Sequence, residues 1–246
     1  MMDLLLTVEK INKSFGGLSA ITNLSFDLCQ GELLGLIGPN GAGKTTFFNL
    51  ISGFLVPDNG KINFQGRSVI GMPPYKIVMQ GITRTFQIPK PFHSLTCLEN
   101  IMVSMIPHLS SKKENAKWIK EKSQTILEES GLCSKEDMLP STLTQGDLKK
   151  LEIARALATK PTLLLLDEPF AGLTSAEITL LSSLIKNLHN SGITMIIIDH
   201  RLKELMKIAQ KLVVLNFGQK IAEGSPEVII HNKKVIEAYL GTEGVE

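Results

Sequence analysis

The 246-residue chain has few cysteines and almost no net charge. Its three cysteines, Cys29, Cys97 and Cys133, are far apart and show no metal-ligand spacing. This pattern argues against a disulfide framework and a zinc site, and it favours a reducing compartment. The formal net charge of +2 is too small to indicate a nucleic-acid or anionic-membrane partner.

Long apolar runs are also missing. The longest, Leu163–Leu166 and Ile193–Ile198, fall far short of the roughly 20 residues that a transmembrane helix needs. The N-terminal stretch MMDLLLTVEK has no basic leader and contains Asp3, so no secretory signal is expected. With 43% hydrophobic and 20% charged residues, the composition is that of a globular protein. Any role at a membrane must therefore depend on another subunit.

The order of the predicted elements indicates an α/β fold. Residues 5–37 contain short apolar runs separated by turns, which predict strands. LLLLDE and ITMIIID are continuous apolar runs on either side of a predicted helix, a pattern typical of buried parallel strands. Between these regions, residues 88–161 have helical periodicity. We therefore expect one domain, 1–246, with a core formed by 1–87 and 162–246 and a helical subdomain formed by 88–161.

A glycine-rich loop joins a predicted strand to a predicted helix. Its sequence GPNGAGKT matches G-x-x-x-x-G-K-[ST] in full. Glycines let the backbone wrap a polyphosphate closely, with N–H groups and the start of a helix facing the anion. Lys44 is expected to reach the β- and γ-phosphates and the Thr45 hydroxyl to ligate Mg²⁺; a turn without chemistry is the alternative. The predicted nucleotide-binding residues are Gly38, Pro39, Asn40, Gly41, Ala42, Gly43, Lys44, Thr45 and Thr46.

Two acidic residues end the strand in LLLLDEP. Asp167 and Glu168 lie where open α/β sheets place their ligands, at the carboxyl end of a strand. Asp167 can hold Mg²⁺, which leaves Glu168 free to act as the general base toward an attacking water. The alternative is an acidic strand end that only caps the following helix.

The stretch LTQGDLKKLEIARALA predicts a capped amphipathic helix. Thr144 or Asp147 can accept from the free N–H groups of the first turn. Leu148, Leu151, Ala154 and Ala158 would then form its buried stripe. Taken alone, the stretch needs no other explanation.

Six motifs, GPNGAGKTT, RTFQ, LTQGD with LEIARAL, LLLLDEP, AGLT and IIIDH, resemble in order and spacing the ATP-binding subunit of ABC transporters. The resemblance covers about residues 5–241. It implies an ABC ATPase fold, that is, a P-loop NTPase core with a mixed sheet, an antiparallel β subdomain and a helical insert subdomain. It also implies that Phe15 stacks on adenine, that Gln87 ligates Mg²⁺ and senses the γ-phosphate, and that His200 contacts the γ-phosphate. Phe15 alone would be read as a core residue.

In this family the segment corresponding to LTQGD closes over the ATP held by a partner subunit. The resemblance thus implies that Thr144, Gln145, Gly146 and Asp147 form half of a shared site. Gln145 replaces a family glycine, and we expect ordinary backbone angles there. Asp147 replaces a glutamine, and because a carboxylate repels phosphate we expect it to cap its own helix at the N–H of Lys149 or Lys150.

In the AGLT motif, Thr174 stands where the family often has Asp or Asn, a departure that bears on communication between the two sites. Because Lys44, Gln87, Glu168 and His200 are all present, the resemblance still implies an active ATPase.

Resemblance within the family favours the uptake of branched-chain (hydrophobic) amino acids or small amides. An ATPase of lipopolysaccharide or lipid export is the alternative, and a soluble ABC ATPase acting on nucleic acid or ribosomes is a further one; a small-molecule P-loop kinase would not need LTQGD or His200. The expected cofactors are ATP and Mg²⁺. The expected partners are transmembrane permease subunits, a second ATP-binding subunit, identical or homologous, and an extracytoplasmic solute-binding protein, with no nucleic acid. The expected place is the cytoplasmic face of the plasma membrane, as a peripheral subunit.

Overall fold

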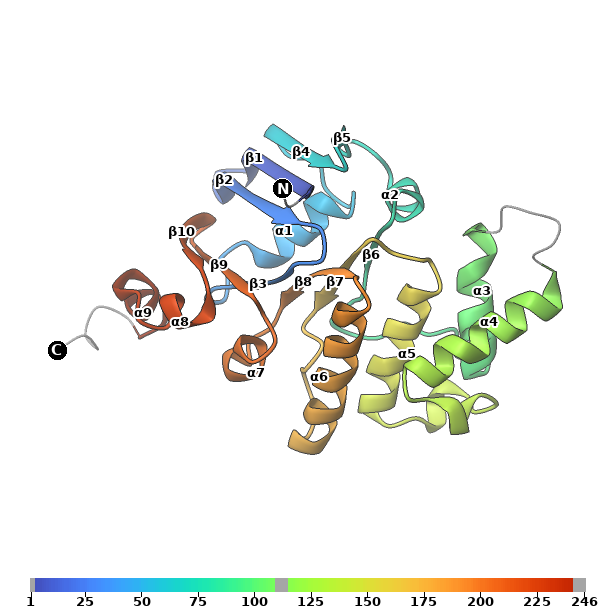
Figure 1. Cartoon of the computed structure of the whole chain (residues 1–246). Coiled ribbons are helices and arrows are strands. Elements are labelled where there is room, and N and C mark those ends of the chain that lie inside the picture. The colour runs from blue at the N-terminus through green and yellow to red at the C-terminus, as the bar shows by residue number, and fades with distance from the viewer. Residues whose placement is uncertain (1–2, 109–114, 241–246) are drawn as a thin grey trace.

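The computed structural model describes residues 3–108 and 115–240. Residues 1–2, 109–114 and 241–246, which include the ends of the predicted domain and part of its predicted helical subdomain, lie outside the described residues. Two β-sheets and a group of helices make up the described chain (Figure 1). Among the described residues, none of the helices has the length and apolarity required to span a bilayer.

The first sheet is antiparallel and has the order β2-β1-β4-β5. Side chains on β2 alternate between buried and more exposed, because one face of the sheet packs on the core while the other meets solvent. The ring centre of Phe26 on β2 lies 5.2 Å from that of Phe47, which belongs to the helix after the phosphate loop. This contact packs the sheet against that helix. The strands are β1 (Leu4–Phe15), β2 (Leu18–Cys29), β4 (Asn59–Phe64) and β5 (Arg67–Ser68).

The second sheet has the order β10-β9-β3-β8-β7-β6. The pairs from β9 to β6 are parallel, and β10 pairs antiparallel with β9. Every residue of β3, β7 and β8 is buried, which explains their continuous apolar sequences and confirms the predicted buried parallel strands. The strands are β3 (Leu33–Ile37), β6 (Ile82–Arg84), β7 (Leu163–Asp167), β8 (Thr194–Ile198), β9 (Lys211–Asn216) and β10 (Gln219–Gly224).

Helices cover both faces of the second sheet. Helix α1 (Lys44–Ile51) packs in the core that also contains the antiparallel sheet, whereas α6 (Ser175–Asn190) packs on the opposite face. The buried residues of α6 recur every three or four positions, as expected for an amphipathic helix. The remaining helices of this part are α2 (Pro74–Gln80), α7 (Leu202–Met206), α8 (Pro226–Ile229) and α9 (Lys233–Leu240).

Three helices gather at one side of the molecule around a hydrophobic cluster of their own (Figure 1). They are α3 (Cys97–Met105), α4 (Ala116–Glu129) and α5 (Gln145–Leu157). Helix α3 begins with a capping box in which Thr96 and Glu99 each satisfy a backbone N–H of the other. Helix α5 also packs against α6, and its N-terminal residue Gly146 lies beside Glu177 in the first turn of α6.

Candidate functional site

The phosphate loop lies between β3 and α1, at the carboxyl end of the parallel strands. Two of its glycines are required by close backbone approach. A Cβ on Gly38 would lie 2.1 Å from the Leu215 carbonyl oxygen, and one on Gly43 would lie 2.5 Å from the Ala20 carbonyl oxygen. Gly43 also has a φ of 99°, which L side chains rarely adopt. The loop can therefore hold this shape only with glycine at both positions.

Lys44 begins helix α1 and is buried. Its Nζ donates to the carbonyl oxygens of Gly38 (2.7 Å) and Pro39 (2.9 Å), so the ammonium lies over the loop. Burial lowers the pKa of Lys44, while the nearby carboxylates of Glu168 and Asp167 act in the opposite direction. The arrangement places a single positive charge where a polyphosphate would bind.

A cavity of about 460 Å³ opens beside the loop and unites residues from distant parts of the chain. Phe15 from β1 lies on its wall with 47% of its surface exposed, so it is not a core residue. Phe217, 83% exposed at the turn between β9 and β10, lines the same cavity, and the sequence analysis gave no sign of it. The other lining residues are Leu18, Ser19, Ala20, Asn40, Gly41, Ala42, Gly43, Lys44, Thr45, Thr46, Glu168 and His200.

Glu168 follows β7 directly and has a left-handed backbone, with φ of 48°. Such a conformation costs a non-glycine residue about 1 kcal/mol, and here the Glu168 N–H is held by the Ile198 carbonyl at 2.8 Å. Its Oε2 accepts from Gln87 Nε2 at 2.8 Å, and its Oε1 lies 3.0 Å from His200 Nε2. Three predicted site residues thus meet at one carboxylate, whose two oxygens are both oriented.

The residue before His200 is a buried acid that shapes this edge of the site. Asp199 accepts from the backbone N–H groups of Phe170 (2.9 Å) and Arg201 (2.7 Å). Burial raises the pKa of Asp199, and the two backbone hydrogen bonds act against that rise. Asp199 therefore ties the loop after β7 to the loop that carries His200.

Asp167 forms a buried ion pair that sequence reasoning did not find. Arg84 Nη2 donates to Asp167 Oδ2 at 2.6 Å, and only 7% of the arginine and 6% of the aspartate side chain are exposed. Arg84 Nη1 donates to Asn49 on α1 at 2.6 Å, and the guanidinium lies 5.4 Å from the ring centres of both Phe48 and Phe86. Arg84 is the first residue of the RTFQ motif, which was the only signal available.

The predicted Mg²⁺ ligands are compatible with that ion. Thr45, Gln87 and Asp167 offer hydroxyl, amide and carboxylate oxygens, the hard donors that Mg²⁺ prefers. Thr45 lines the nucleotide cavity, and Gln87 reaches Glu168 at the same place. Asp167 Oδ2 is engaged by Arg84, whereas the hydrogen bonds of the described residues leave Oδ1 available.

The LTQGD segment begins helix α5 with Thr144 as its N-cap. Gln145 is the first helical residue and is not among the positive-φ positions, which confirms the expected ordinary backbone. The expectation for Asp147 was wrong in its partner: the carboxylate does not cap the N–H of Lys149 or Lys150. Instead Thr144 caps the helix, and Asp147 Oδ2 accepts from the Thr144 hydroxyl (2.8 Å) and from the Lys135 ammonium.

The physical reason is that lysine ammonium groups reach the Asp147 carboxylate. Lys135 bonds to it, and Lys150 Nζ lies 3.9 Å from Oδ1. Burial alone would raise the pKa of Asp147, but the hydrogen bonds from Lys135 and Thr144 together with the lysine charges hold it below its usual value. The ionised carboxylate is thus neutralised within the chain.

Gly146 and Thr174 meet through one further side chain. Thr174 is the N-cap of α6, in a capping box with Glu177. The other oxygen of that carboxylate, Glu177 Oε1, accepts from the Gly146 N–H at 3.2 Å. The segment 144–147 and Thr174 therefore lie together, but they do not line the nucleotide cavity of their own chain.

Known proteins are similar to this chain in sequence and in fold. Residues 21–171 match the family described as ABC transporter, and residues 219–245 match the family described as branched-chain amino acid ATP-binding cassette transporter. The chain is 38% identical to the high-affinity branched-chain amino acid transport ATP-binding protein LivG of Salmonella typhimurium, covering 96% of this chain and 98% of LivG. It is 33% identical to the lipopolysaccharide export system ATP-binding protein LptB of Haemophilus influenzae, covering 96% and 97%.

Among solved structures, the ADP conformation of MJ1267, an ATP-binding cassette of an ABC transporter, superposes with a TM-score of 0.88 at 34% identity. The match covers 97% of this chain and 99% of MJ1267. Sequence and fold agree over nearly the whole length, and the expected α/β ABC ATPase fold is confirmed. The chain is a member of the ABC transporter family and is an ATP-binding, ATP-hydrolysing subunit.

Proposed function

We propose that this chain couples ATP hydrolysis to the uptake of branched-chain amino acids by an ABC transporter. The observation that carries the chemistry is the convergence of Gln87 and His200 on Glu168, beside the buried Lys44. In this role, Glu168 accepts a proton from the attacking water, and Gln87 and His200 hold the carboxylate in its orientation. Lys44 neutralises phosphate charge, and Phe15 stacks on the adenine ring.

Mg²⁺, held by Thr45, Gln87 and Asp167, would supply Lewis-acid stabilisation of the phosphate charge. The donor set supports this assignment, because all three side chains offer an oxygen ligand. Thr45 lines the cavity beside the phosphate loop, and Gln87 bonds to Glu168 at the same cavity. The Arg84 ion pair keeps the Asp167 carboxylate fixed in place for that role.

In this proposal a second ATP-binding subunit, identical to this chain or homologous to it, completes the site. The segment 144–147 begins a helix, whose N-terminus favours anions, yet it does not line the cavity of its own chain. In a head-to-tail pair, the Gly146 N–H and the Thr144 hydroxyl would face the γ-phosphate held by the partner. Both groups bond within the chain here, to Glu177 and Asp147, so pairing would exchange these partners for phosphate oxygens.

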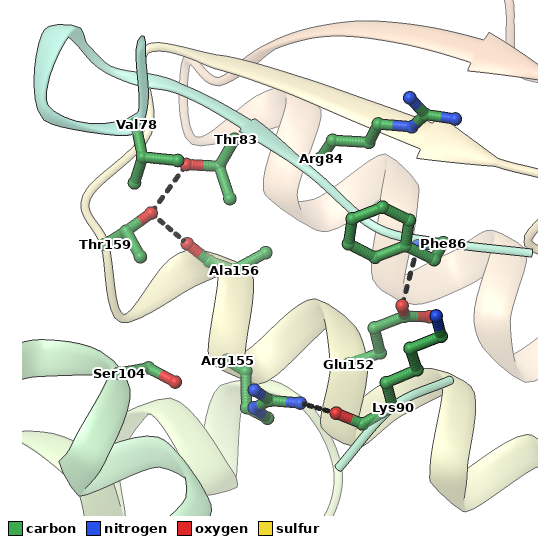
Figure 2. A pocket seen from close by; sticks show the side chains of 10 residues that line it. All are labelled: Val78, Thr83, Arg84, Phe86, Lys90, Ser104, Glu152, Arg155, Ala156 and Thr159. Atoms are coloured by element: carbon green, nitrogen blue, oxygen red, sulfur yellow. Dashed lines mark hydrogen bonds between the residues drawn. The ribbon is translucent and has the colours of Figure 1, made fainter. Parts of the chain in front are cut away.

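The permease subunits dock at the pocket of about 200 Å³ between β6, α3 and α5 (Figure 2). Exposed apolar side chains lie on the segments that line it, among them Tyr75 at 66% and Ile88 at 72% exposure. Glu152 accepts from the Phe86 N–H at 2.6 Å and Arg155 donates to the Lys90 carbonyl at 2.6 Å, so the pocket joins the segment beyond Gln87 to helix α5 (Figure 2). We assign residues 88–161 as the subdomain that transmits motion to the permease.

The cargo assignment follows from the relatives. The match of residues 219–245 and the 38% identity to LivG favour amino-acid uptake over lipopolysaccharide export, for which the identity to LptB is 33%. In this function an extracytoplasmic solute-binding protein delivers the amino acid, and the chain lies at the cytoplasmic face of the membrane, bound to its permease.

The test is reconstitution of the chain with its permease subunits in vesicles that contain the solute-binding protein. Leucine uptake should require ATP, and Glu168→Gln should reduce ATP turnover about 10² to 10⁴-fold while the affinity for ATP stays within about twofold. Near-normal turnover in this variant would remove Glu168 from its role. ATP-dependent release of lipid, with no uptake of leucine, would refute amino-acid uptake and identify a lipid as the cargo.

A further inference from the structure

Lys149, in the second turn of helix α5, is a buried lysine that bridges two residues of the site. Only 4% of its surface is exposed. Its Nζ donates to the backbone carbonyl of Gln87 at 2.7 Å and to that of Glu168 at 3.1 Å. The side chains of these same two residues bond each other at 2.8 Å. One ammonium thus holds the backbone of both partners of the pair that carries the chemistry.

Four carboxylates near Lys149 oppose the effect of its burial. Burial lowers the pKa of Lys149, and the carboxylates of Glu152, Asp199, Asp167 and Glu168 oppose that lowering. Burying a charged group costs free energy, and an apolar residue of similar volume often packs equally well in its place. A cation at this position is therefore better explained by its bonds to the Gln87 and Glu168 carbonyls than by a contribution to stability.

Helix α5 connects Lys149 rigidly to the segment 144–147, which meets a partner chain in the proposed function. Its N-terminal residues are Gln145 and Gly146, less than two turns from Lys149. A displacement of this end of the helix moves the Lys149 ammonium and with it the carbonyls of Gln87 and Glu168. Lys149 thus links two half-sites of one chain: the segment 144–147, which the chain offers to its neighbour, and the Gln87–Glu168 pair, which it uses at its own phosphate loop.

We propose that Lys149 is a positioning residue that sets the Gln87–Glu168 pair and makes cleavage at a chain's own phosphate loop depend on the docking of its helix α5. This inference rests on the proposed function, because it assumes that residues 144–147 meet a partner. Lys149 does not line the nucleotide cavity, so its loss should affect turnover and leave ATP binding intact.

The first experiment compares Lys149→Met, which keeps the length and loses the donor, with Lys149→Arg, which restores a cationic donor. Lys186→Met, the same change at an exposed position of α6, is the control. We expect Lys149→Met to lower kcat at least 20-fold with KM for ATP and the affinity for a fluorescent ATP analogue within threefold of wild type. Lys149→Arg should recover at least a quarter of the wild-type kcat, and Lys186→Met should match wild type.

The second experiment needs no turnover and therefore separates this inference from the proposed function. Hydrogen exchange of the nucleotide-free chain is followed in the peptides that contain residues 85–92 and 168–171. Both peptides should exchange at least fivefold faster in Lys149→Met than in wild type, with no change in Lys186→Met. A wild-type chain without ATPase activity would refute the proposed function, whereas this exchange result would still decide whether Lys149 holds the two carbonyls.

Two results would overturn the assignment. One is a Lys149→Met variant whose kcat and exchange both stay within twofold of wild type. The other is equal loss of kcat in Lys149→Met and Lys149→Arg with a matching loss of thermal stability, because that pattern identifies a packing role.

Discussion

Replacing Arg84 with methionine should destabilise the protein more than any surface change. The substitution leaves the buried Asp167 carboxylate without its partner at 2.6 Å, and it also removes the hydrogen bond to Asn49. Breaking a buried ion pair in this way costs about 3 to 5 kcal/mol, because an uncompensated charge stays behind. For a chain of this length, 1 kcal/mol corresponds to about 2 to 4 °C in Tm, so the expected loss is about 6 to 20 °C.

The assay is thermal unfolding followed by circular dichroism, without nucleotide. Lys207→Met is the matched control, because it breaks an ion pair of 2.8 Å whose lysine is 64% exposed, and such a pair contributes at most about 1 kcal/mol. The double variant Arg84→Met with Asp167→Asn should recover most of the lost stability, since no buried charge remains. A Tm within 2 °C of wild type in Arg84→Met would refute the reasoning that this pair is buried and strongly coupled.

Two further predictions concern the nucleotide cavity and helix α5. Phe15→Ala should weaken ATP binding about 2- to 12-fold by equilibrium titration, because aromatic stacking contributes about 0.5 to 1.5 kcal/mol, and unchanged affinity would place adenine elsewhere. Asp147→Asn should cost about 1 to 3 kcal/mol of unfolding free energy at pH 7. Because the pKa of Asp147 is lowered in the folded state, its contribution is present above the ordinary value near 4 and is lost as the pH falls through the lowered one. The difference between wild type and Asp147→Asn should therefore shrink on acidification, and a constant difference from pH 7 to pH 3 would contradict the paired carboxylate.

Local sequence signals were sufficient for the elements that carry strong patterns. The phosphate loop, the buried strands β7 and β8 and the amphipathic helix α6 each follow from spacing within about 16 residues. By contrast, α2 and β6 were not predicted. Strand β6 has only three residues, too few for a periodic pattern, and its position depends on pairing with β7 across the chain.

The site shows the same division. The motifs were sufficient to assign Lys44, Glu168 and His200 to the site. The pairing of Arg84 with Asp167 could not be predicted in this way, because the two residues lie 83 positions apart in the chain. The contact of Lys149 with Gln87 spans 62 positions. For Asp147, the local capping rule selected a backbone partner, but Lys135, at the end of the short 3₁₀ helix Cys133–Lys135, forms the stronger charge-assisted bond. Contacts that folding alone creates could not be predicted from local rules.

The shared site is tested most directly by mixing two inactive variants before ATP is added. Gly146→Leu disables the half-site offered to the neighbour, and the atoms nearest to its Cβ belong to the Glu177 side chain. Glu168→Gln disables the half-site that cleaves. A mixed pair contains one site with both halves intact, so mixing should raise turnover to at most about a quarter of the wild-type value. Turnover should stay below that ceiling to the extent that cleavage depends on docking of the cleaving chain's own helix α5, and each variant alone should be inactive. Wild-type turnover by Gly146→Leu alone would contradict a site that two chains build together.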